Sequence, residues 1–114
     1  MNTLYYYTNS VECEPSLLVS DCRDYKKILI DNEWPFINVD LHRNKSERES
    51  LTQIIGKKLT TPQFIIRDSS NALVTYFSSM DLKRELNMGS DSGEIYFTAA
   101  KFLLEEKLIK YQVI

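Results

Sequence analysis

Apolar and polar residues alternate in blocks along this chain, and the spacing inside each block predicts a structural element. Residues 3–8 (TLYYYT) are rich in tyrosine and threonine and predict a short strand. From Pro15 onward, apolar residues recur three and four positions apart as far as residue 29. This spacing predicts a helix with one buried face, which begins at Pro15 and ends near residues 31–35 (DNEWP), because the residue before a proline disfavours helix.

The middle of the chain predicts a second strand and a second helix. Residues 35–41 (PFINVDL) form an apolar run of strand length, followed by nine mostly polar residues. The next helix would be capped by Ser46 or Ser50 and would end at Gly56. Its inner face would carry Leu51, Ile54 and Ile55.

Two further strands and a third helix follow. Residues 60–68 (TTPQFIIRD) and 71–77 (NALVTYF) predict strands joined as a hairpin by DSSN. Residues 78–88 (SSMDLKRELNM) predict a short helix capped by Ser78 or Ser79. The element order is β-α-β-α-β-β-α, with an early parallel pair and a late antiparallel pair, which indicates an α/β fold with a mixed four-stranded sheet.

The last part of the chain predicts an extra C-terminal helix. The linker GSDSG separates a domain of residues 1–88 from an extension of residues 89–114. From about residue 94 to residue 110, apolar residues wrap much of the way around the predicted helix, which indicates more than one packing partner. The helix would dock on its own domain, and its exposed remainder offers a surface for a homodimer.

Composition narrows the classes of function. The 114 residues carry a net charge of −2, with basic and acidic residues interleaved, which argues against nucleic-acid binding and against a membrane-surface patch. No apolar run reaches the roughly 20 residues of a membrane helix, and the first residues lack signal-peptide features, so we expect a cytoplasmic protein. Two cysteines and one histidine, His42, are too few for a four-ligand zinc site, so we expect no metal, and His42 is expected at the surface.

Three segments resemble the thioredoxin/glutaredoxin superfamily, in particular small phage-type glutaredoxins. Residues 5–16 (YYYTNSVECEPS) resemble the family's first strand and its Cys-x-x-Cys loop, here degenerate. Residues 34–41 (WPFINVDL) resemble its second strand, and residues 56–66 (GKKLTTPQFII) resemble the segment that leads into a cis proline. The resemblance covers roughly residues 3 to 88 and implies a thioredoxin-like fold with the extra C-terminal helix.

The resemblance also implies a site. Cys13 would be the nucleophile at a helix N-terminus, where the helix dipole stabilises a thiolate, and Ser16 would occupy the resolving position beyond Pro15. Pro62 would be the cis proline, with Thr61 offering main-chain contacts to a substrate. Two further residues, Lys57 and Lys58, could hold a carboxylate of glutathione. We expect no resident cofactor; by resemblance to monothiol glutaredoxins, a Cys-x-x-Ser centre could also share an iron–sulfur cluster with glutathione.

A second alignment stays open. It places Cys22 at the resolving position and Val19 at the nucleophile position, but the helix-start signal at Pro15 favours the first alignment. If the helix begins at Pro15, Cys22 lies nine residues beyond Cys13, about 13 Å along the helix. A disulfide requires Cα atoms within about 7 Å, so we expect no active-site disulfide between Cys13 and Cys22 unless the helix begins late. Because Cys22 falls on the apolar face of the predicted helix, we expect it to be a buried structural thiol.

Two functions compete at this point. A Cys-x-x-Ser centre implies monothiol thiol–disulfide exchange with a thiol or disulfide protein client, in which glutathione or another thiol resolves the mixed disulfide. Glu12 and Glu14 flank Cys13 and oppose a thiolate, and the bulky Tyr76 and Phe77 occupy the region where glutaredoxins carry small glycines. These departures favour the alternative, a redox-inactive interaction protein that binds a partner through the old substrate groove or the C-terminal helix.

Overall fold

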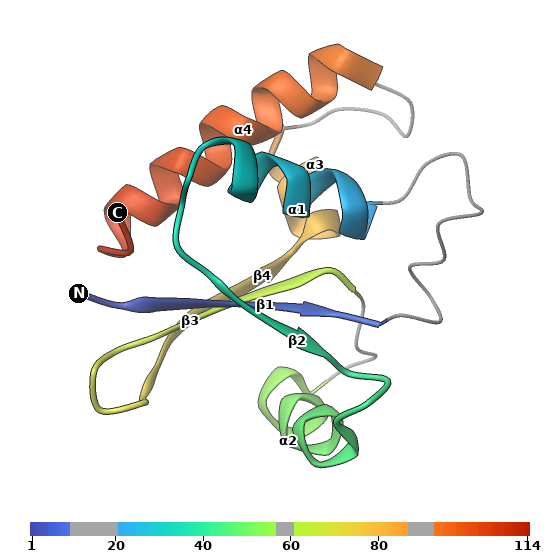
Figure 1. The fold of residues 1–114 in the computed structure, drawn as a ribbon, viewed down its shortest axis with the longest axis vertical. Helices are drawn as coiled ribbons and strands as arrows, with labels where there is room; N and C mark the ends of the chain where they lie inside the picture. Colours follow the sequence, from blue (N-terminus) through green and yellow to red (C-terminus); the bar gives the residue numbers. More distant parts are fainter. Residues whose placement is uncertain (10–20, 57–60, 87–92) are drawn as a thin grey trace.

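The chain folds around a mixed four-stranded sheet, which Figure 1 shows in a computed structural model. The structure describes residues 1–9, 21–56, 61–86 and 93–114. The strand order is β2-β1-β3-β4, in which β1 pairs in parallel with β2 and antiparallel with β3, and β3 pairs antiparallel with β4. The strands are β1 (Thr3–Thr8), β2 (Ile37–Asp40), β3 (Gln63–Arg67) and β4 (Leu73–Ser78).

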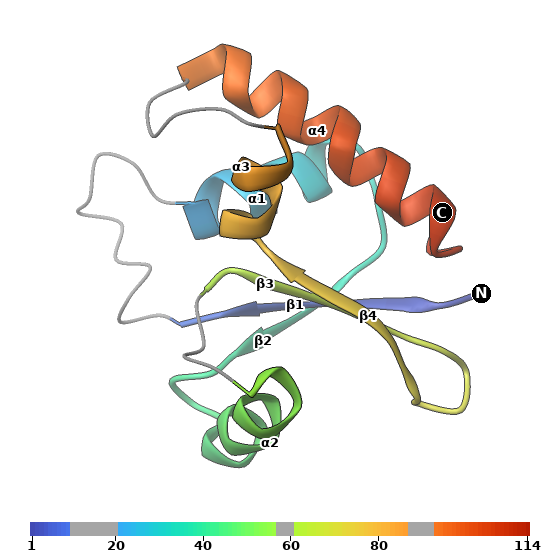
Figure 2. The same ribbon diagram turned by 180° about the vertical axis from the view of Figure 1, so that it is seen from behind.

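Helices cover both faces of this sheet. Three of them, α1, α3 and α4, lie on one face, and α2 lies on the other face, as the two opposite views in Figures 1 and 2 show. This arrangement confirms the expected element order with its extra C-terminal helix, and it is the α/β architecture of a thioredoxin-like fold. The helices are α1 (Asp21–Asp31), α2 (Lys45–Ile55), α3 (Ser79–Leu86) and α4 (Gly93–Lys110).

The alternation along β1 creates two cores, one on each face of the sheet. Leu4 and Tyr6 are wholly buried in the larger core, which β3, β4 and the three helices of that face complete. Tyr7 faces the smaller core, together with Ile65 of β3 and Leu51 of α2. Because successive strand residues point to opposite faces, the tyrosine-rich run of β1 supplies large side chains to both cores.

The ends of the first two helices test the boundary predictions. The expected start of the first helix at Pro15 lies outside the described residues, whereas its end at Asp31 agrees with the prediction. The expected cap of α2 at Ser46 or Ser50 is wrong, because α2 begins at Lys45 with Asn44 at the N-cap position. Asn44 makes no side-chain cap; its Nδ2 instead donates to the main-chain oxygen of Asp40 at 2.9 Å. Gly56 ends α2 as expected, in the left-handed conformation with φ 67°.

The turns around β4 follow the predicted chemistry. Residues 68–72 close the β3–β4 hairpin, with Asp68 Oδ1 accepting hydrogen bonds from the amides of Ser70 and Ala72. Ser78 caps α3: its Oγ accepts from the amide of Asp81, and the Asp81 carboxylate accepts from the amide of Ser78. This reciprocal pair confirms Ser78 as one of the two expected caps.

α4 is part of the larger core. Ala100, Leu104 and Leu108 are wholly buried against it, and the ring of Phe97 meets that of Tyr25 of α1 at 5.9 Å. The expectation that this helix docks on its own domain is therefore confirmed. The expected boundary between residues 88 and 89 lies outside the described residues. Within the described residues, no helix combines the length and apolar character that crossing a membrane requires.

Candidate functional site

One end of the sheet carries the residues that the family resemblance singles out and that the structure describes. The last residues of β1, the first residues of β3 and the start of α1 lie together at this end in both views (Figures 1 and 2). Thr61 and Pro62 immediately precede β3, and their peptide bond is cis, as expected. Five predicted site residues lie outside the described residues, so their positions stay predictions: Cys13, Pro15, Ser16, Lys57 and Lys58.

Polar side chains are buried at this same end of the sheet. Gln63 lies between Tyr7 of β1 and Ser78 of β4 in the strand register, and the amide of Ser79 donates to the carbonyl of Pro62 at 3.3 Å. In the described part of the chain, every buried side-chain nitrogen or oxygen has a hydrogen-bond partner. The buried polar residues of that part all belong to this end or border it: Asn9, Gln63, Ser78 and Ser79.

Cys22 occupies the first turn of α1 and is buried, with 7% of its surface exposed. Its sulfur is disulfide-bonded, so the expectation of a structural thiol is wrong, although the expected burial is confirmed. The expectation assumed a helix that begins at Pro15; the described part of that helix, α1, spans Asp21–Asp31, and the segment before it lies outside the described residues. The chain contains one other cysteine, Cys13.

One tyrosine of the run that predicted the first strand contacts this turn. The hydroxyl of Tyr6, in the middle of β1, donates to the main-chain oxygen of Cys22 at 2.6 Å. Tyr6 is wholly buried, and its ring lies 5.1 Å from that of Phe64 and 6.0 Å from that of Phe36. No sequence pattern distinguishes Tyr6 from its neighbours Tyr5 and Tyr7, because the pairing depends on how α1 crosses β1.

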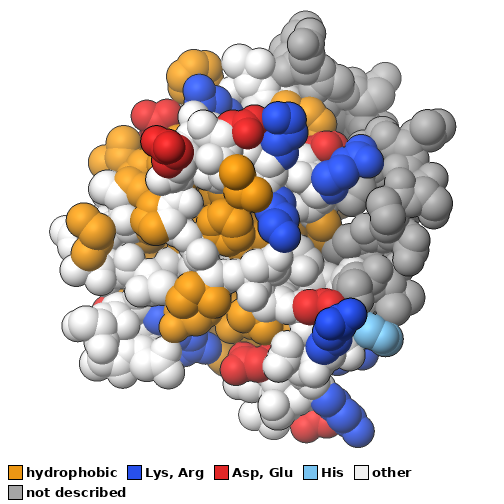
Figure 3. Space-filling view, viewed as in Figure 1, with side chains coloured by type: hydrophobic (Ala, Val, Ile, Leu, Met, Phe, Trp, Pro, Cys, Tyr) orange, Lys and Arg blue, Asp and Glu red, His pale blue; other side chains and the backbone are white. Residues whose placement is uncertain are grey.

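Within the described residues, positive and negative side chains at this end lie next to each other. Arg23, next to Cys22, lies 3.6 Å from the carboxylate of Asp24, and both belong to the first turns of α1. Positive and negative side chains are interspersed over the face that Figure 3 shows. The described part of the site therefore offers a buried sulfur and satisfied polar groups rather than a strong charge.

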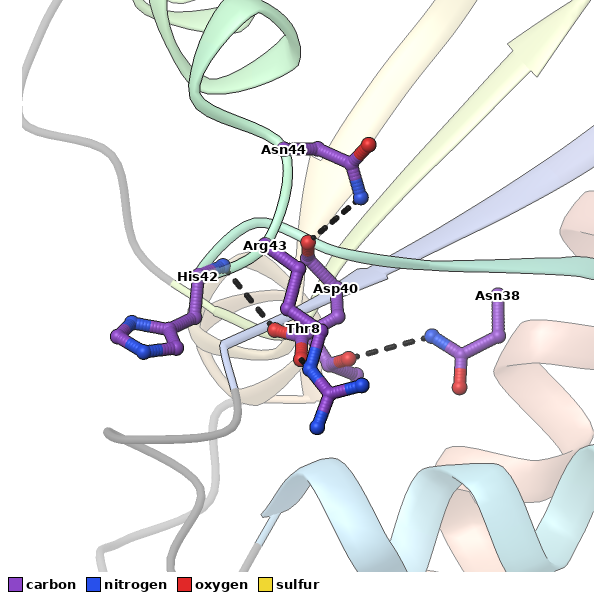
Figure 4. Close-up of polar contacts among 6 residues, drawn as sticks. All are labelled: Thr8, Asn38, Asp40, His42, Arg43 and Asn44. Carbon is purple, nitrogen blue, oxygen red and sulfur yellow. Dashed lines mark hydrogen bonds and ion pairs between the residues drawn. The ribbon is translucent and has the colours of Figure 1, made fainter.

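A second polar cluster closes the turn between β2 and α2, and Figure 4 shows its arrangement. Asp40 organises it: its carboxylate accepts from the amide of His42 at 3.0 Å and lies 3.8 Å from Nε of Arg43. The ring of His42 points away from the cluster into solvent (Figure 4), which confirms its expected surface position. These contacts shape a turn, and within the described residues no three or more His, Cys, Asp or Glu side chains are grouped to hold a metal.

A cavity of about 310 Å³ opens at the other end of β1. It adjoins the start of β1, Pro35 to Ile37 and Val113, and its lining carries no charged side chain. Because it lies at the beginning of β1, whereas Cys22 and Pro62 lie near the end of that strand, it is separate from the sulfur site.

Comparisons with known proteins agree with the fold. No protein-family model and no curated protein match the chain. Among solved structures, the chain is similar to the crystal structure of a disulphide isomerase from Xylella fastidiosa Temecula1, with 18% sequence identity and a TM-score of 0.50. The similarity covers 90% of this chain and 78% of that chain. At 18% identity the similarity concerns the fold alone. Together with the mixed sheet and its helices, it identifies the architecture of this chain as thioredoxin-like.

Proposed function

We propose that this chain is a thiol–disulfide exchange protein in which Cys13 and Cys22 are the two reacting sulfurs. The observation that carries the proposal is the disulfide bond of Cys22 in the first turn of α1. With two cysteines in the chain, an intrachain bond of Cys22 has Cys13 as its partner. In the predicted cytoplasmic location, a disulfide is expected to be transient and catalytic rather than structural.

The two sulfurs would have different tasks. The thiolate of Cys13 attacks a client disulfide, which forms a mixed disulfide and releases one client thiolate. The thiolate of Cys22 then attacks the Cys13 sulfur, which forms the intrachain disulfide and releases the second client thiolate. The client gains two electrons and the chain loses them, and a reducing dithiol or glutathione restores the chain. Cys22 suits the second task because a buried thiol is shielded from clients.

The predicted monothiol form differs in what resolves the mixed disulfide. With Ser16 at the resolving position, a thiol from glutathione or another protein would have to complete the reaction. The disulfide bond of Cys22 supports resolution within the chain. In both forms Thr61 and Pro62 would contact the main chain of the client beside the site, and Lys57 and Lys58 could hold a carboxylate.

Reaction with oxidised glutathione, followed by intact-mass analysis, tests the proposal. The wild-type chain is expected to lose two hydrogens by forming the intrachain disulfide, with little glutathione retained. Cys22→Ser is expected to retain one glutathione on Cys13, because the internal thiol that would release it is missing. Cys13→Ser, the matched control, is expected to react slowly, because its remaining thiol is buried.

Two outcomes of this experiment would contradict the proposal. A wild-type chain that keeps glutathione as firmly as Cys22→Ser supports the monothiol form. Inertness of the reduced wild-type chain toward glutathione and toward a peptide disulfide contradicts both forms. A further check is the pH dependence of alkylation at Cys13: a rate that follows an ordinary thiol pKa of about 8.5 would also argue against an activated sulfur.

The second candidate function is a redox-inactive interaction protein. It is favoured by Phe102 and Ile109 on the outer side of α4, which are 61% and 56% exposed although both are large and apolar. Apolar side chains also reach the surface along α4 in Figure 3. A helix that buries one side and exposes apolar residues on another offers a surface for a second copy or another protein.

Light scattering after size exclusion tests this candidate. If α4 forms a homodimer, the wild-type chain is expected to show twice the monomer mass at high concentration, and Phe102→Ser with Ile109→Ser is expected to stay monomeric. Met80→Ser is the matched control, since Met80 is 49% exposed and lies on α3. A monomeric wild-type chain at all concentrations contradicts the homodimer.

A further inference from the structure

A buried hydrogen bond joins the centre of the sheet to the sulfur-bearing turn. The hydroxyl of Tyr6 donates to the carbonyl oxygen of Cys22 at 2.6 Å, across sixteen residues of sequence. Tyr6 is wholly buried, and Phe36 and Phe64 enclose its ring. Burying a hydroxyl that has no hydrogen-bond partner costs free energy. A position of α1 in which the Cys22 carbonyl stays within hydrogen-bond distance of the Tyr6 hydroxyl is therefore favoured.

The carbonyl of Cys22 can accept this bond without losing its helical one. In an α-helix that carbonyl points toward the amide of Lys26, four residues on, and a carbonyl oxygen has a second lone pair for the tyrosine hydroxyl. The first turn of α1 is therefore anchored to β1 at the residue that carries the sulfur. Helix ends otherwise fray, because their first turns have fewer hydrogen bonds and contacts.

We propose that Tyr6 is a positioning residue for the thiol chemistry, in that its hydroxyl keeps the backbone of Cys22 in place when the disulfide is open. This role depends on the proposed function. Closing a disulfide within a chain is favoured when the attacking thiol is already held near its target, since less conformational entropy is lost in the reaction. Tyr6 exchanges neither electrons nor protons in this reaction. Its hydrogen bond raises the fraction of time in which the Cys22 sulfur is placed to react with Cys13.

Tyr6→Phe tests this inference, because it removes the hydroxyl and keeps the ring. The equilibrium constant for the intrachain disulfide, measured against mixtures of reduced and oxidised glutathione, is expected to fall about three- to tenfold, as one hydrogen bond implies. Tyr5→Phe is the matched control: Tyr5 lies next to Tyr6 on β1 but packs against the smaller core, and its variant is expected to match the wild type.

A purely structural hydrogen bond would give a different result. It would lower the stability of the oxidised and reduced chains equally, so the disulfide equilibrium of Tyr6→Phe would equal that of the wild type. That result would overturn the role of Tyr6 and leave the proposed function intact. A wild-type chain that forms no intrachain disulfide at any glutathione ratio would overturn the proposed function, and the role of Tyr6 with it.

A measurement on the wild-type chain covers the case in which Tyr6→Phe does not fold. In the reduced chain, the amide hydrogen of Lys26 is expected to exchange slowly with solvent, because the anchored carbonyl of Cys22 keeps the first turn of α1 closed. Exchange of this amide at the rate of an unfolded peptide would overturn the inference.

Discussion

The stability of the fold depends on pH through Tyr7, a side chain of the smaller core. Its side chain is buried with 3% exposure, and its hydroxyl lies 3.4 Å from Oε2 of Glu47 on α2. Burial raises the pKa of Tyr7 to about 12, and the negative charge of Glu47 adds to this effect, against a smaller opposite effect of Arg67. The hydroxyl thus stays neutral in the folded chain over a range in which it ionises in the unfolded chain.

Stability is therefore expected to fall at alkaline pH. Because the folded pKa lies above the ordinary value of 10.0, the contribution of Tyr7 is fully present below about pH 10 and is lost as the pH rises through about 12. The loss should be about 1 to 2 kcal/mol after allowance for solvent screening. Urea unfolding at several pH values between about 8 and 12 measures this decrease in the free energy of unfolding.

A comparison of two phenylalanine variants isolates this effect. Tyr7→Phe should show a smaller decrease in stability over this range than the wild type, because its core residue cannot ionise. Tyr5→Phe, which keeps Tyr7, should decrease nearly as the wild type does, because Tyr5 is the smallest of the contributions to the pKa of Tyr7. Equal slopes for Tyr7→Phe and the wild type would contradict the assignment to Tyr7.

At the scale of elements, α3, the shortest helix within the described residues, depends most on its first turn. α3 has eight residues and begins directly where β4 ends, so Ser78 belongs to the strand pairing with Gln63 and also caps the helix. Leu82 is the wholly buried apolar residue that α3 contributes to the larger core. A helix this short is marginal on its own, so its cap and its core contact decide whether it forms.

Removing the cap is expected to destabilise the protein measurably. Ser78→Ala leaves the amide of Asp81 without its acceptor in a part-buried position and should lower the free energy of unfolding by about 1 kcal/mol. Ser46→Ala is the matched control, since Ser46 is exposed in α2 and does not cap that helix. Urea unfolding compares the two variants, and equal effects would mean that the contacts of Ser78 do not stabilise α3.

At the scale of the whole molecule, α4 completes the larger core. Its buried residues meet side chains from the sheet and from α1 and α3, so a segment remote in sequence becomes part of the same interior. The opposite side of α4 is exposed at Phe102 and Ile109. The buried side of α4 therefore contributes to the stability of the fold, and its exposed apolar side is the surface of the proposed interaction with another protein.

Two truncations to alanine on α4 separate these roles. Leu104→Ala should lower the free energy of unfolding by about 2 to 5 kcal/mol, because Leu104 is wholly buried and its loss leaves a cavity. Phe102→Ala, two positions away and 61% exposed, should change it by less than about 0.5 kcal/mol. Thermal and urea unfolding measure both, and a large effect of Phe102→Ala would show that the outer side of α4 is needed for folding.

Much of the fold could be predicted because local rules determine where elements lie. The apolar spacing, the glycine after α2 and the serine before α3 each predicted a feature that the structure contains. The cap of α2 could not be predicted from the same rules, since serine and asparagine are both good capping residues. The contact of Asn44 with Asp40 belongs to the turn after β2, and this turn brings the chain into the helix at Lys45.

The sequence by itself determined the order and type of the elements, because these follow from residues that are close together along the chain. It also contains two cysteines, and it makes a cis Thr61–Pro62 bond chemically possible because the second residue is a proline. Only the tertiary structure decided which tyrosine of β1 meets Cys22, that Cys22 lies in the first turn of α1 with its sulfur bonded, and which side of α4 is buried. These are relations between residues far apart along the chain, and they arise when helices pack on a twisted sheet, which residue spacing alone does not specify.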